Sequence, residues 1–348
     1  MTNKKLNILI VRTDRIGDVV LSLPLAAEIK KHYPDSKISF LVREYTSALL
    51  DSHPYVDDVI LLPMNENKID KKKIINELRN KNFDYGIVVY PTFEIAWILF
   101  RAGIKYRIGT GYRLYSFLFN KKIYEHRKSG HLHELEYNLN LLKLLGIEHQ
   151  INKSNVSFNI HVDDNSKRKV DDFLSKNQYS KELPTVIVHP GSGGSAVDWP
   201  FSHFKELIDL LAQRLSINLI ITGSESEKEM CEKLMNDKTI NTAGEFNLSE
   251  LIALIDNADV LIANSTGPIH IASGLGKHVI GFYPKIEECA PRRWGPYTHK
   301  SVVFSPEIDC HECTREQCER LNCMATIQPD EVFSSVEAII AQITSGRN

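Results

Sequence analysis

The chain has 348 residues, 43% of them hydrophobic, which is too many for one typical core and suits two domains of ordinary size. Its formal net charge is -2 and 25% of its residues are charged, so no overall field favours nucleic acid, and we expect no such partner. No apolar signal core precedes the first strand, and no apolar run is long enough to span a membrane. We therefore expect a cytoplasmic protein whose six cysteines are mostly reduced.

Buried-strand and helical patterns alternate along the first half of the chain, which predicts a parallel sheet covered by helices. The predicted strands are residues 6–11, 37–42, 59–62, 85–90 and 107–109, and the predicted helices are residues 19–32, 46–52, 74–81, 93–101 and 134–145. Residues 150–182 are polar, with one helical stretch near residues 166–176. We assign residues 1–160 to an N-terminal lobe and residues 161–182 to a linker.

The same alternation restarts in residues 183–348, the predicted C-terminal lobe. Strands are predicted at residues 185–189, 218–222, 259–263 and 277–283, and helices at residues 204–215, 227–235, 248–257 and 329–344, with a further short helix after Asn264. We find no internal repeat and no heptad series, which excludes solenoid and fibrous folds. The predicted fold class is α/β, with two successive doubly wound lobes and a cleft between them.

Residues 264–270 (Asn-Ser-Thr-Gly-Pro-Ile-His) follow a buried strand and begin a helix. Ser265 or Thr266 can N-cap this helix, and Pro268 suits its first turn. Unpaired backbone N–H groups at a helix start, together with the positive end of the helix dipole, attract a phosphate or diphosphate. The alternative is an ordinary, well-capped α/β crossover.

The first strand ends in a loop, residues 12–18 (Arg-Thr-Asp-Arg-Ile-Gly-Asp), which gathers two acids and two arginines at a helix start. Gly17 allows the backbone to approach a ligand, and the helix dipole keeps Asp18 ionised and available as a base. The alternative is a capping aspartate beside solvated arginines. Because no GxGxxG motif accompanies this loop, a nicotinamide cofactor is disfavoured.

A glycine-rich loop, residues 190–195 (Pro-Gly-Ser-Gly-Gly-Ser), follows the first strand of the second lobe and exposes amides to anionic oxygens, although it could also be a flexible connection. It lacks the Gly-Lys-Ser/Thr ending of a P-loop, which disfavours ATPase chemistry. Glu225, beyond the next strand, could accept ribose hydroxyls or be an ordinary first-turn acid. The chain has no Asp-x-Asp motif, so we expect no divalent cation to bridge a sugar-nucleotide diphosphate.

Residues 101–130 contain eight Lys or Arg, only one acid, Glu125, and several interleaved aromatic residues. Such a stretch suits an anionic acceptor or an acidic membrane surface, because each basic residue near a charged bilayer adds about 1 kcal/mol. The alternative is a solvated face over a partly buried aromatic helix.

Four cysteines fall within fourteen residues near the C-terminus: Cys310, Cys313, Cys318 and Cys323. Four thiolates can hold zinc or iron tetrahedrally, but the spacing favours a thiol-rich or locally crosslinked loop. We therefore expect neither a metal nor another cofactor.

Together, three motifs resemble those of the bacterial heptosyltransferases of glycosyltransferase family 9, the lipopolysaccharide inner-core enzymes. They are residues 10–18, residues 189–192 with 198–200, and residues 264–270, and the resemblance covers nearly the whole chain. It implies a GT-B fold, in which two Rossmann-like lobes face a cleft, the first holding the acceptor and the second ADP-heptose. It also implies metal-independent, inverting transfer.

The resemblance assigns roles to individual residues. The aspartate after the glycine of the first loop, Asp18, corresponds to the catalytic base. Donor contacts fall on Gly191, Ser192, Gly193, Glu225, Ser265, Thr266, Gly267 and His270. Two positions depart from the family pattern and bear on donor choice: Val197 replaces a common lysine, and Ser265 stands where an aspartate often occurs.

The predicted reaction begins when Asp18 takes a proton from an acceptor hydroxyl that attacks the anomeric carbon opposite the departing ADP. The amides at residues 192–194 and 266–270 stabilise the leaving diphosphate. Acceptor-binding cations are predicted at Arg12, Arg15, Arg107 and Arg113. The expected partners are ADP-heptose and an anionic lipopolysaccharide core acceptor, with peripheral contact at the cytoplasmic face of the inner membrane.

Three alternatives stay open. The same fold could use another nucleotide sugar, it could bind a nucleotide without turnover, or it could be a nucleotide-sugar epimerase.

Overall fold

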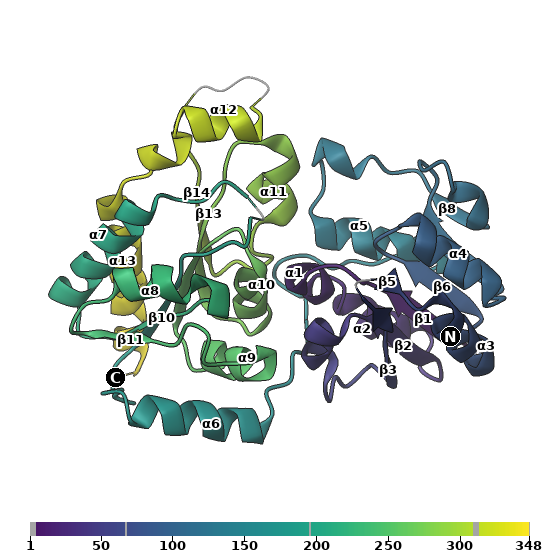
Figure 1. Cartoon of the computed structure of the whole chain (residues 1–348), viewed down its shortest axis with the longest axis horizontal. Coiled ribbons are helices and arrows are strands. Elements are labelled where there is room, and N and C mark those ends of the chain that lie inside the picture. The colour runs from purple at the N-terminus through teal and green to yellow at the C-terminus, as the bar shows by residue number, and fades with distance from the viewer. Residues whose placement is uncertain (1–4, 67, 195, 309–312, 348) are drawn as a thin grey trace. The chain divides into compact units, whose positions relative to one another are not determined.

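The computed structural model describes residues 5–66, 68–194, 196–308 and 313–347, which form two compact units (Figure 1). The N-terminal unit contains the described residues up to Arg127 together with Leu132–His161. The C-terminal unit contains Lys128–His131 and the described residues from Val162 onward. None of the described helices is long and apolar enough to cross a membrane.

The N-terminal unit is built on a six-stranded parallel sheet of order β3-β2-β1-β6-β7-β8. Its strands are β1 (Asn7–Val11), β2 (Lys37–Val42), β3 (Asp58–Leu61), β6 (Tyr85–Val88), β7 (Tyr106–Thr110) and β8 (Lys121–Ile123). In the centre, Ile8 pairs with Ile38 on one side and with Tyr85 on the other. The central strands are almost continuously apolar because helices cover both faces of such a sheet. A two-stranded antiparallel ribbon, β4 (Met64–Asn65) and β5 (Lys68–Ile69), lies outside this sheet.

Helices and 3-10 turns connect these strands: α1 (Ile16–Val20), α2 (Pro24–His32), η1 (Glu44–Leu50), α3 (Lys71–Lys81), α4 (Phe93–Arg101), η2 (Ser116–Leu118), η3 (Arg127–Ser129), α5 (Glu134–Asn140) and η4 (Leu141–Leu145). The helix predicted at residues 19–32 is in fact two helices, because Pro24 lacks the N–H that a continuous helix needs there. The helix predicted at residues 46–52 is the 3-10 segment η1. The helix predicted at residues 134–145 changes to 3-10 geometry after Asn140.

The C-terminal unit repeats the architecture, with a parallel sheet of order β11-β10-β9-β12-β13-β14. Its strands are β9 (Thr185–His189), β10 (Asn218–Ile221), β11 (Thr239–Asn241), β12 (Val260–Asn264), β13 (His278–Phe282) and β14 (Ser301–Phe304). The two edge strands, β11 and β14, are not among the strands predicted from sequence. They have three and four residues and are only partly buried, so the pattern that marks a strand is weak in both.

The helices of this unit are α6 (Asp164–Ser175), α7 (Phe201–Arg214), α8 (Lys228–Leu234), α9 (Leu248–Asp256), α10 (Gly267–Gly274), α11 (Pro291–Trp294), α12 (Arg315–Arg320) and α13 (Pro329–Arg347), with 3-10 turns η5 (Glu225–Glu227), η6 (Glu287–Cys289) and η7 (Cys323–Thr326). Helix α6 lies in the segment predicted as a linker, yet it packs against α9. Lys169 Nζ lies 2.7 Å from Glu250 Oε1, and Phe173 meets Phe246 edge to face at 5.2 Å. This segment is therefore part of the C-terminal unit.

Both sheets have the same strand order. In each, the first strand is central, the next two strands are added on one side of it, and the remaining three strands are added on the other side. The order therefore switches between β1 and β6 in one unit and between β9 and β12 in the other. Loops at the carboxyl ends of such strand pairs diverge, which is where doubly wound sheets bind their ligands. The loops after β1, β9 and β12 are therefore the expected ligand-binding positions.

Candidate active site

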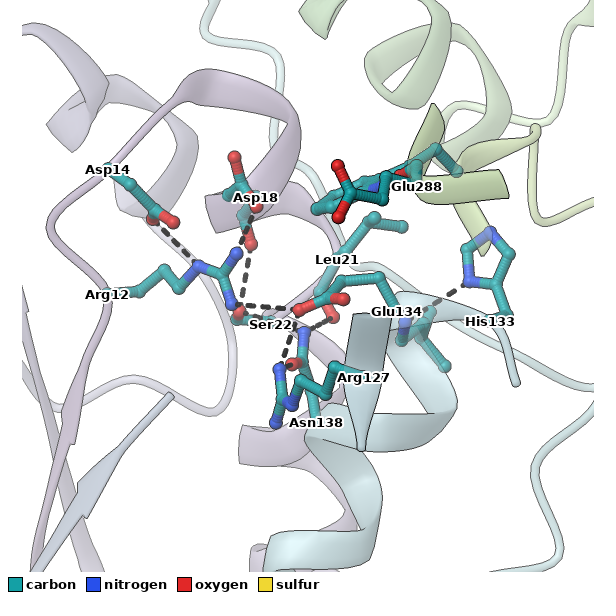
Figure 2. Close-up of polar contacts among 12 residues, drawn as sticks. Arg12, Asp14, Asp18, Leu21, Ser22, Arg127, His133, Glu134, Asn138 and Glu288 are labelled. Atoms are coloured by element: carbon teal, nitrogen blue, oxygen red, sulfur yellow. Dashed lines mark hydrogen bonds and ion pairs between the residues drawn. The ribbon is translucent and has the colours of Figure 1, made fainter. Parts of the chain in front are cut away.

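A buried arginine surrounded by carboxylates lies at the carboxyl end of β1 (Figure 2). The side chain of Arg12 is only 2% exposed. Its Nε donates to Asp14 Oδ1 at 2.7 Å, its Nη2 pairs with Asp18 Oδ1, and its Nη1 lies 3.7 Å from Glu134 Oε1. A buried charge without partners costs several kcal/mol, so these acids are what allow Arg12 to be buried.

Glu134 also holds a second arginine. Arg127 Nη1 donates to Glu134 Oε1 at 2.6 Å and to Asn138 Oδ1 at 2.9 Å. Asn138 Nδ2 in turn donates to the carbonyl of Leu21 at 3.1 Å, which ties α5 to the segment between α1 and α2. We call Arg12, Asp14, Asp18, Arg127 and Glu134 the Arg12 cluster.

Charge in the Arg12 cluster is unbalanced, with three carboxylates facing two guanidinium groups. Burial lowers the pKa of Arg12, but the charges of Asp18, Asp14 and Glu134 outweigh burial, so its pKa lies above the ordinary value and it stays protonated. Burial also raises the pKa of Asp14 to about 6, with the charge of Asp18 acting in the same direction and Arg12 opposing both. The carboxyl of Asp14 therefore binds and releases its proton near pH 6.

Asp18 lies in the first turn of α1, and its side chain is 14% exposed. This short helix begins after Arg15, whose backbone is extended, and Gly17 in its first turn is buried. The ion pair with Arg12 fixes the carboxylate of Asp18 at the end of β1. A carboxylate that is held in place and still reaches solvent can serve as a general base.

In the C-terminal unit, Asn264 connects the motif at residues 264–270 to the segment that contains the glycine-rich loop, residues 190–195. Its Oδ1 accepts from the backbone N–H of Trp199 at 2.8 Å, and its Nδ2 donates to the carbonyl of Pro190 at 2.6 Å. Trp199 is anchored in the core, stacked on Phe282 at 4.2 Å, with its Nε1 donating to the carbonyl of Ile327 at 3.0 Å. The first residue of the glycine-rich loop, Pro190, and Trp199 beyond its end are thus both bonded to the last residue of β12.

The start of α10 lies directly after Asn264. Thr266 is the N-cap residue, with extended φ of -149°, and in the described chain its side chain caps no backbone amide. Pro268 brings no N–H of its own. Ser265, Thr266 and Gly267 are partly exposed, whereas His270 is buried at 4% exposure. An N-terminus that its own cap residue leaves unsatisfied can receive anionic oxygens.

Close packing explains two glycines around this site. A Cβ on Gly191 would lie 1.8 Å from Glu227 Oε1, so a side chain at this position would displace the Glu227 carboxylate from the glycine-rich loop. A Cβ on Gly244 would lie 2.2 Å from Glu225 Oε2, which places that carboxylate against the backbone beyond β11. Burial lowers the pKa of His189 at the end of β9, with Glu227 opposing it, so this imidazole is neutral at physiological pH.

The predicted donor residues all lie at the carboxyl edge of the second sheet: Gly191, Ser192 and Gly193 after β9, Glu225 after β10, and Ser265, Thr266, Gly267 and His270 after β12. The hydroxyl of Ser265 is hydrogen-bonded to Tyr283. Burial raises the pKa of Tyr283 and this hydrogen bond lowers it, and burial has the larger effect. Val197 is 8% exposed and packs in the apolar core with Trp199.

The predicted acceptor cations do not all gather. Arg12 is in the Arg12 cluster and Arg15 is the N-cap residue of α1. Arg107 donates instead to two backbone carbonyls, from Nε to Leu118 at 2.7 Å and from Nη1 to Ile104 at 2.6 Å, and burial lowers its pKa. Arg113 is exposed in the loop after β7. Acceptor contact by Arg107 and Arg113 stays a prediction, and in this structure Arg107 braces a loop.

Glu134, Arg127 and Asn138 are not among the site residues predicted from the sequence. Their only local signal is an acid in the first turn of a helix after a basic stretch, which is typical of many helices.

Of the four clustered cysteines, Cys310 lies outside the described residues. Cys318 and Cys323 are free thiols, and the described residues contain no group of His, Cys, Asp or Glu that could hold a metal. Burial raises the pKa of Cys318 to about 12, and its neighbours Cys323 and Cys313 act in the same direction. Cys318 is therefore a neutral thiol, packed with Cys323 in the core of the C-terminal unit.

Two doubly wound units, each with a polar site at its switch point, define a two-lobed α/β fold, and comparison with known proteins identifies the family. The model of glycosyltransferase family 9 (heptosyltransferase) matches residues 72–324, so the chain belongs to this family and is a glycosyltransferase. The resemblance read from the motifs is thereby confirmed.

Particular relatives cover almost the whole chain. A putative glycosyltransferase of Haemophilus influenzae is 29% identical, over 86% of this chain and 89% of that protein. The lipopolysaccharide core heptosyltransferase OpsX of the same organism is 26% identical, over 85% and 83% respectively. The solved structure of Escherichia coli ADP-heptose lps heptosyltransferase II is 22% identical with a TM-score of 0.79, over 97% of this chain and 100% of that one. The predicted GT-B fold, with two Rossmann-like lobes, is confirmed.

Proposed function

We propose that this protein is an inverting, metal-independent heptosyltransferase that moves heptose from ADP-heptose to the inner core of lipopolysaccharide, where the acceptor sugar is Kdo or heptose. The observation that carries the proposal is the N-terminus of α10, which its cap residue leaves unsatisfied and which Asn264 links to the glycine-rich loop. Family membership supplies the reaction class. The names of relatives that act on lipopolysaccharide support the choice of acceptor.

The C-terminal unit would bind the donor. The amides of α10 and of residues 192–194 would receive the diphosphate, and Glu225, beyond the neighbouring strand β10, would accept the ribose hydroxyls. Negative charge grows on the diphosphate as the bond from its oxygen to the anomeric carbon breaks. Preorganised amides at this position stabilise that charge without reorganising during the reaction.

The N-terminal unit would bind the acceptor and activate it. Asp18 would take the proton of the acceptor hydroxyl while the oxygen forms its bond to the anomeric carbon, on the face opposite the departing ADP. The configuration at that carbon is then inverted. Arg12 would keep the carboxylate of Asp18 in place, and Arg15 would contact anionic groups of the acceptor sugars.

A lipopolysaccharide precursor carries its sugars on a membrane lipid. The enzyme would therefore act at the cytoplasmic face of the inner membrane, as a peripheral protein.

The experiment is to incubate the protein with ADP-heptose and truncated core acceptors that end in Kdo or in the first heptose, and to follow ADP release and product mass. We expect one heptose to be added to one of these acceptors. ADP binding without donor consumption would contradict the proposal and indicate a nucleotide-binding protein. Isomerisation of the donor without acceptor would indicate an epimerase.

A second candidate is the same reaction with another nucleotide sugar, and two positions favour testing it. Val197 is buried in the apolar core where relatives commonly have lysine, and Ser265 contacts Tyr283 where an aspartate often occurs. The donor site therefore has neither that cation nor that acid. A panel of nucleotide sugars, read by mass spectrometry in the presence of acceptor, distinguishes the two candidates.

A further inference from the structure

Helix α4 of the N-terminal unit is apolar on two sides. Ile95, Ala96, Ile98 and Leu99 are buried in the core of the unit. Phe93, Trp97 and Phe100, at positions i, i+4 and i+7, form a second stripe that is 52%, 37% and 45% exposed. Their rings are continuous, with centroids 6.4 Å apart from Phe93 to Trp97 and 5.9 Å from Trp97 to Phe100. A soluble helix normally has polar residues on its outer side, so this stripe calls for a partner.

The loop after β7 extends this stripe. Leu114 is fully exposed and Phe117 is 73% exposed. Tyr115, one of the two residues between them, ties the loop to α4, because its ring meets that of Phe93 at 6.0 Å and its hydroxyl donates to the carbonyl of Pro91 at 2.6 Å. Leu114 and Phe117 are therefore presented by a braced loop.

Cations surround the aromatic stripe. A groove of about 530 Å³ between α3 and α4 is lined by Lys72, Ile75, Asn76, Arg79, Trp97 and Arg101, three of which are basic and none acidic. The guanidinium of Arg101 lies 5.8 Å from the centre of the Trp97 ring. The one acid of α4, Glu94, is paired with Lys71 at 2.7 Å. We call the stripe, Leu114, Phe117 and these three cations the α4 face.

We propose that the α4 face docks on the surface of an anionic phospholipid bilayer. Aromatic rings settle at the boundary between headgroups and acyl chains, while lysine and arginine beside them contact lipid phosphates. The complementarity of charge selects this occupant, because Lys72, Arg79 and Arg101 are exposed and line one groove with Trp97, where Arg79 Nη2 also donates to the carbonyl of Arg101 at 3.0 Å. The docking stands on this surface alone, but its use in reaching a lipid-anchored acceptor rests on the proposed function.

The test is sedimentation of the full-length protein with vesicles of phosphatidylcholine alone or mixed with phosphatidylglycerol. We expect binding to the mixed vesicles only, weakened by salt. Each cation removed should weaken binding about fivefold, so Lys72→Ala with Arg79→Ala should weaken it about 30-fold. Lys153→Ala, an exposed lysine in the same unit, is the matched control and should bind as the wild type does.

A second readout follows the aromatic stripe. Trp97 is the exposed tryptophan of the stripe, so lipids brominated in their upper acyl chains should quench part of the protein fluorescence. Trp97→Phe should abolish that quenching with the fold unchanged. Trp97→Ala with Phe100→Ala should lower vesicle binding at least tenfold, whereas Leu321→Ser, an exposed apolar residue of the other unit, should not.

Equal binding to neutral and anionic vesicles, no vesicle binding, or unchanged binding by folded variants of the α4 face would overturn the inference. Binding of inorganic phosphate in the groove without vesicle binding would also overturn it. The same holds if a soluble protein, and not a bilayer, binds the α4 face. Transfer to a lipid-free acceptor should be unchanged in these variants. If vesicle binding occurs and transfer does not, the proposed function fails and the docking surface stands.

Discussion

At the scale of single residues, Arg12 organises the N-terminal site. Its charge is buried among Asp14, Asp18 and Glu134, and it compensates the charge of all three acids, although Glu134 also pairs with Arg127. A buried ion pair adds little net stability over apolar residues of the same volume, but removing one member leaves the others without a counterion. Such an arrangement fixes the position of Asp18 more than it stabilises the fold.

Replacing Arg12 by methionine should lower the free energy of unfolding by about 3–5 kcal/mol, because three carboxylates lose a shared cation. Urea unfolding at neutral pH measures this loss. Arg113→Met, at an exposed position, is the control and should change the free energy by no more than about 0.5 kcal/mol. Equal stability of the two variants would show that the cluster is not held by Arg12.

The pKa of Asp14 predicts how stability depends on pH. It is raised from 3.8 to about 6 in the folded protein, so between these values the folded state binds more protons than the unfolded state. The contribution of Asp14 to the free energy of unfolding should therefore fall as the pH rises through this window. Asp14→Asn should remove that part of the slope, measured by urea unfolding between pH 4 and pH 7. An identical slope in both proteins would contradict the assignment.

The sequence predicts part of the Arg12 cluster. Arg12, Asp14 and Asp18 lie within one loop, so their proximity follows from the short strand-to-helix connection. Glu134 and Arg127 join them only because α5 packs beside α2. No local sequence pattern predicts that Glu134 lies near Arg12, more than a hundred residues away. Arg107 is predicted to bind the acceptor because it lies in a basic stretch. Composition alone does not show that its guanidinium donates to backbone carbonyls of its own unit.

At the scale of elements, α10 is the feature with the clearest chemical consequence. Within the described part of the chain, the side chain of its N-cap residue caps no backbone amide, although threonine commonly does. A helix start without a side-chain cap costs helix stability, and its first-turn amides can then receive a ligand. A change at this position should therefore move stability and ligand affinity in opposite directions.

Thr266→Asp tests this opposition. An aspartate at the N-cap should stabilise the helix by about 0.5–1 kcal/mol and, by occupying the amides with negative charge, weaken ADP binding at least tenfold. Calorimetric titration with ADP and thermal unfolding measure the two effects. Thr314→Asp, at the capped start of α12, should leave ADP affinity unchanged. Unaltered ADP affinity in Thr266→Asp would place the diphosphate elsewhere.

The central strands and the long helices are predictable because their apolar periods are long and uniform. The strands β9 and β12 agree with the prediction to within a residue. The edge strands β11 and β14 escape prediction because they are short and half exposed, and η1 differs from its prediction because periodicity does not separate 3-10 from α geometry.

At the scale of the whole molecule, the two units share one strand order and carry complementary chemistry. The N-terminal unit holds carboxylates and arginines at its switch point, and the C-terminal unit holds backbone amides and a neutral histidine. The alternation of strands and helices is enough to predict two α/β lobes. It is not enough to place α6, which looks like a polar linker in sequence and is held to α9 by contacts from distant residues.

The proposed transfer depends on Asp18 as the base that activates the acceptor, and Asp18→Asn tests this role most directly. Asparagine keeps the size of the side chain and cannot take the proton, so turnover with ADP-heptose and a core acceptor should fall by about 10² or more. ADP affinity, which depends on the other unit, should stay as in the wild type, and urea unfolding verifies that the variant is folded. Full turnover in the folded variant would contradict the account.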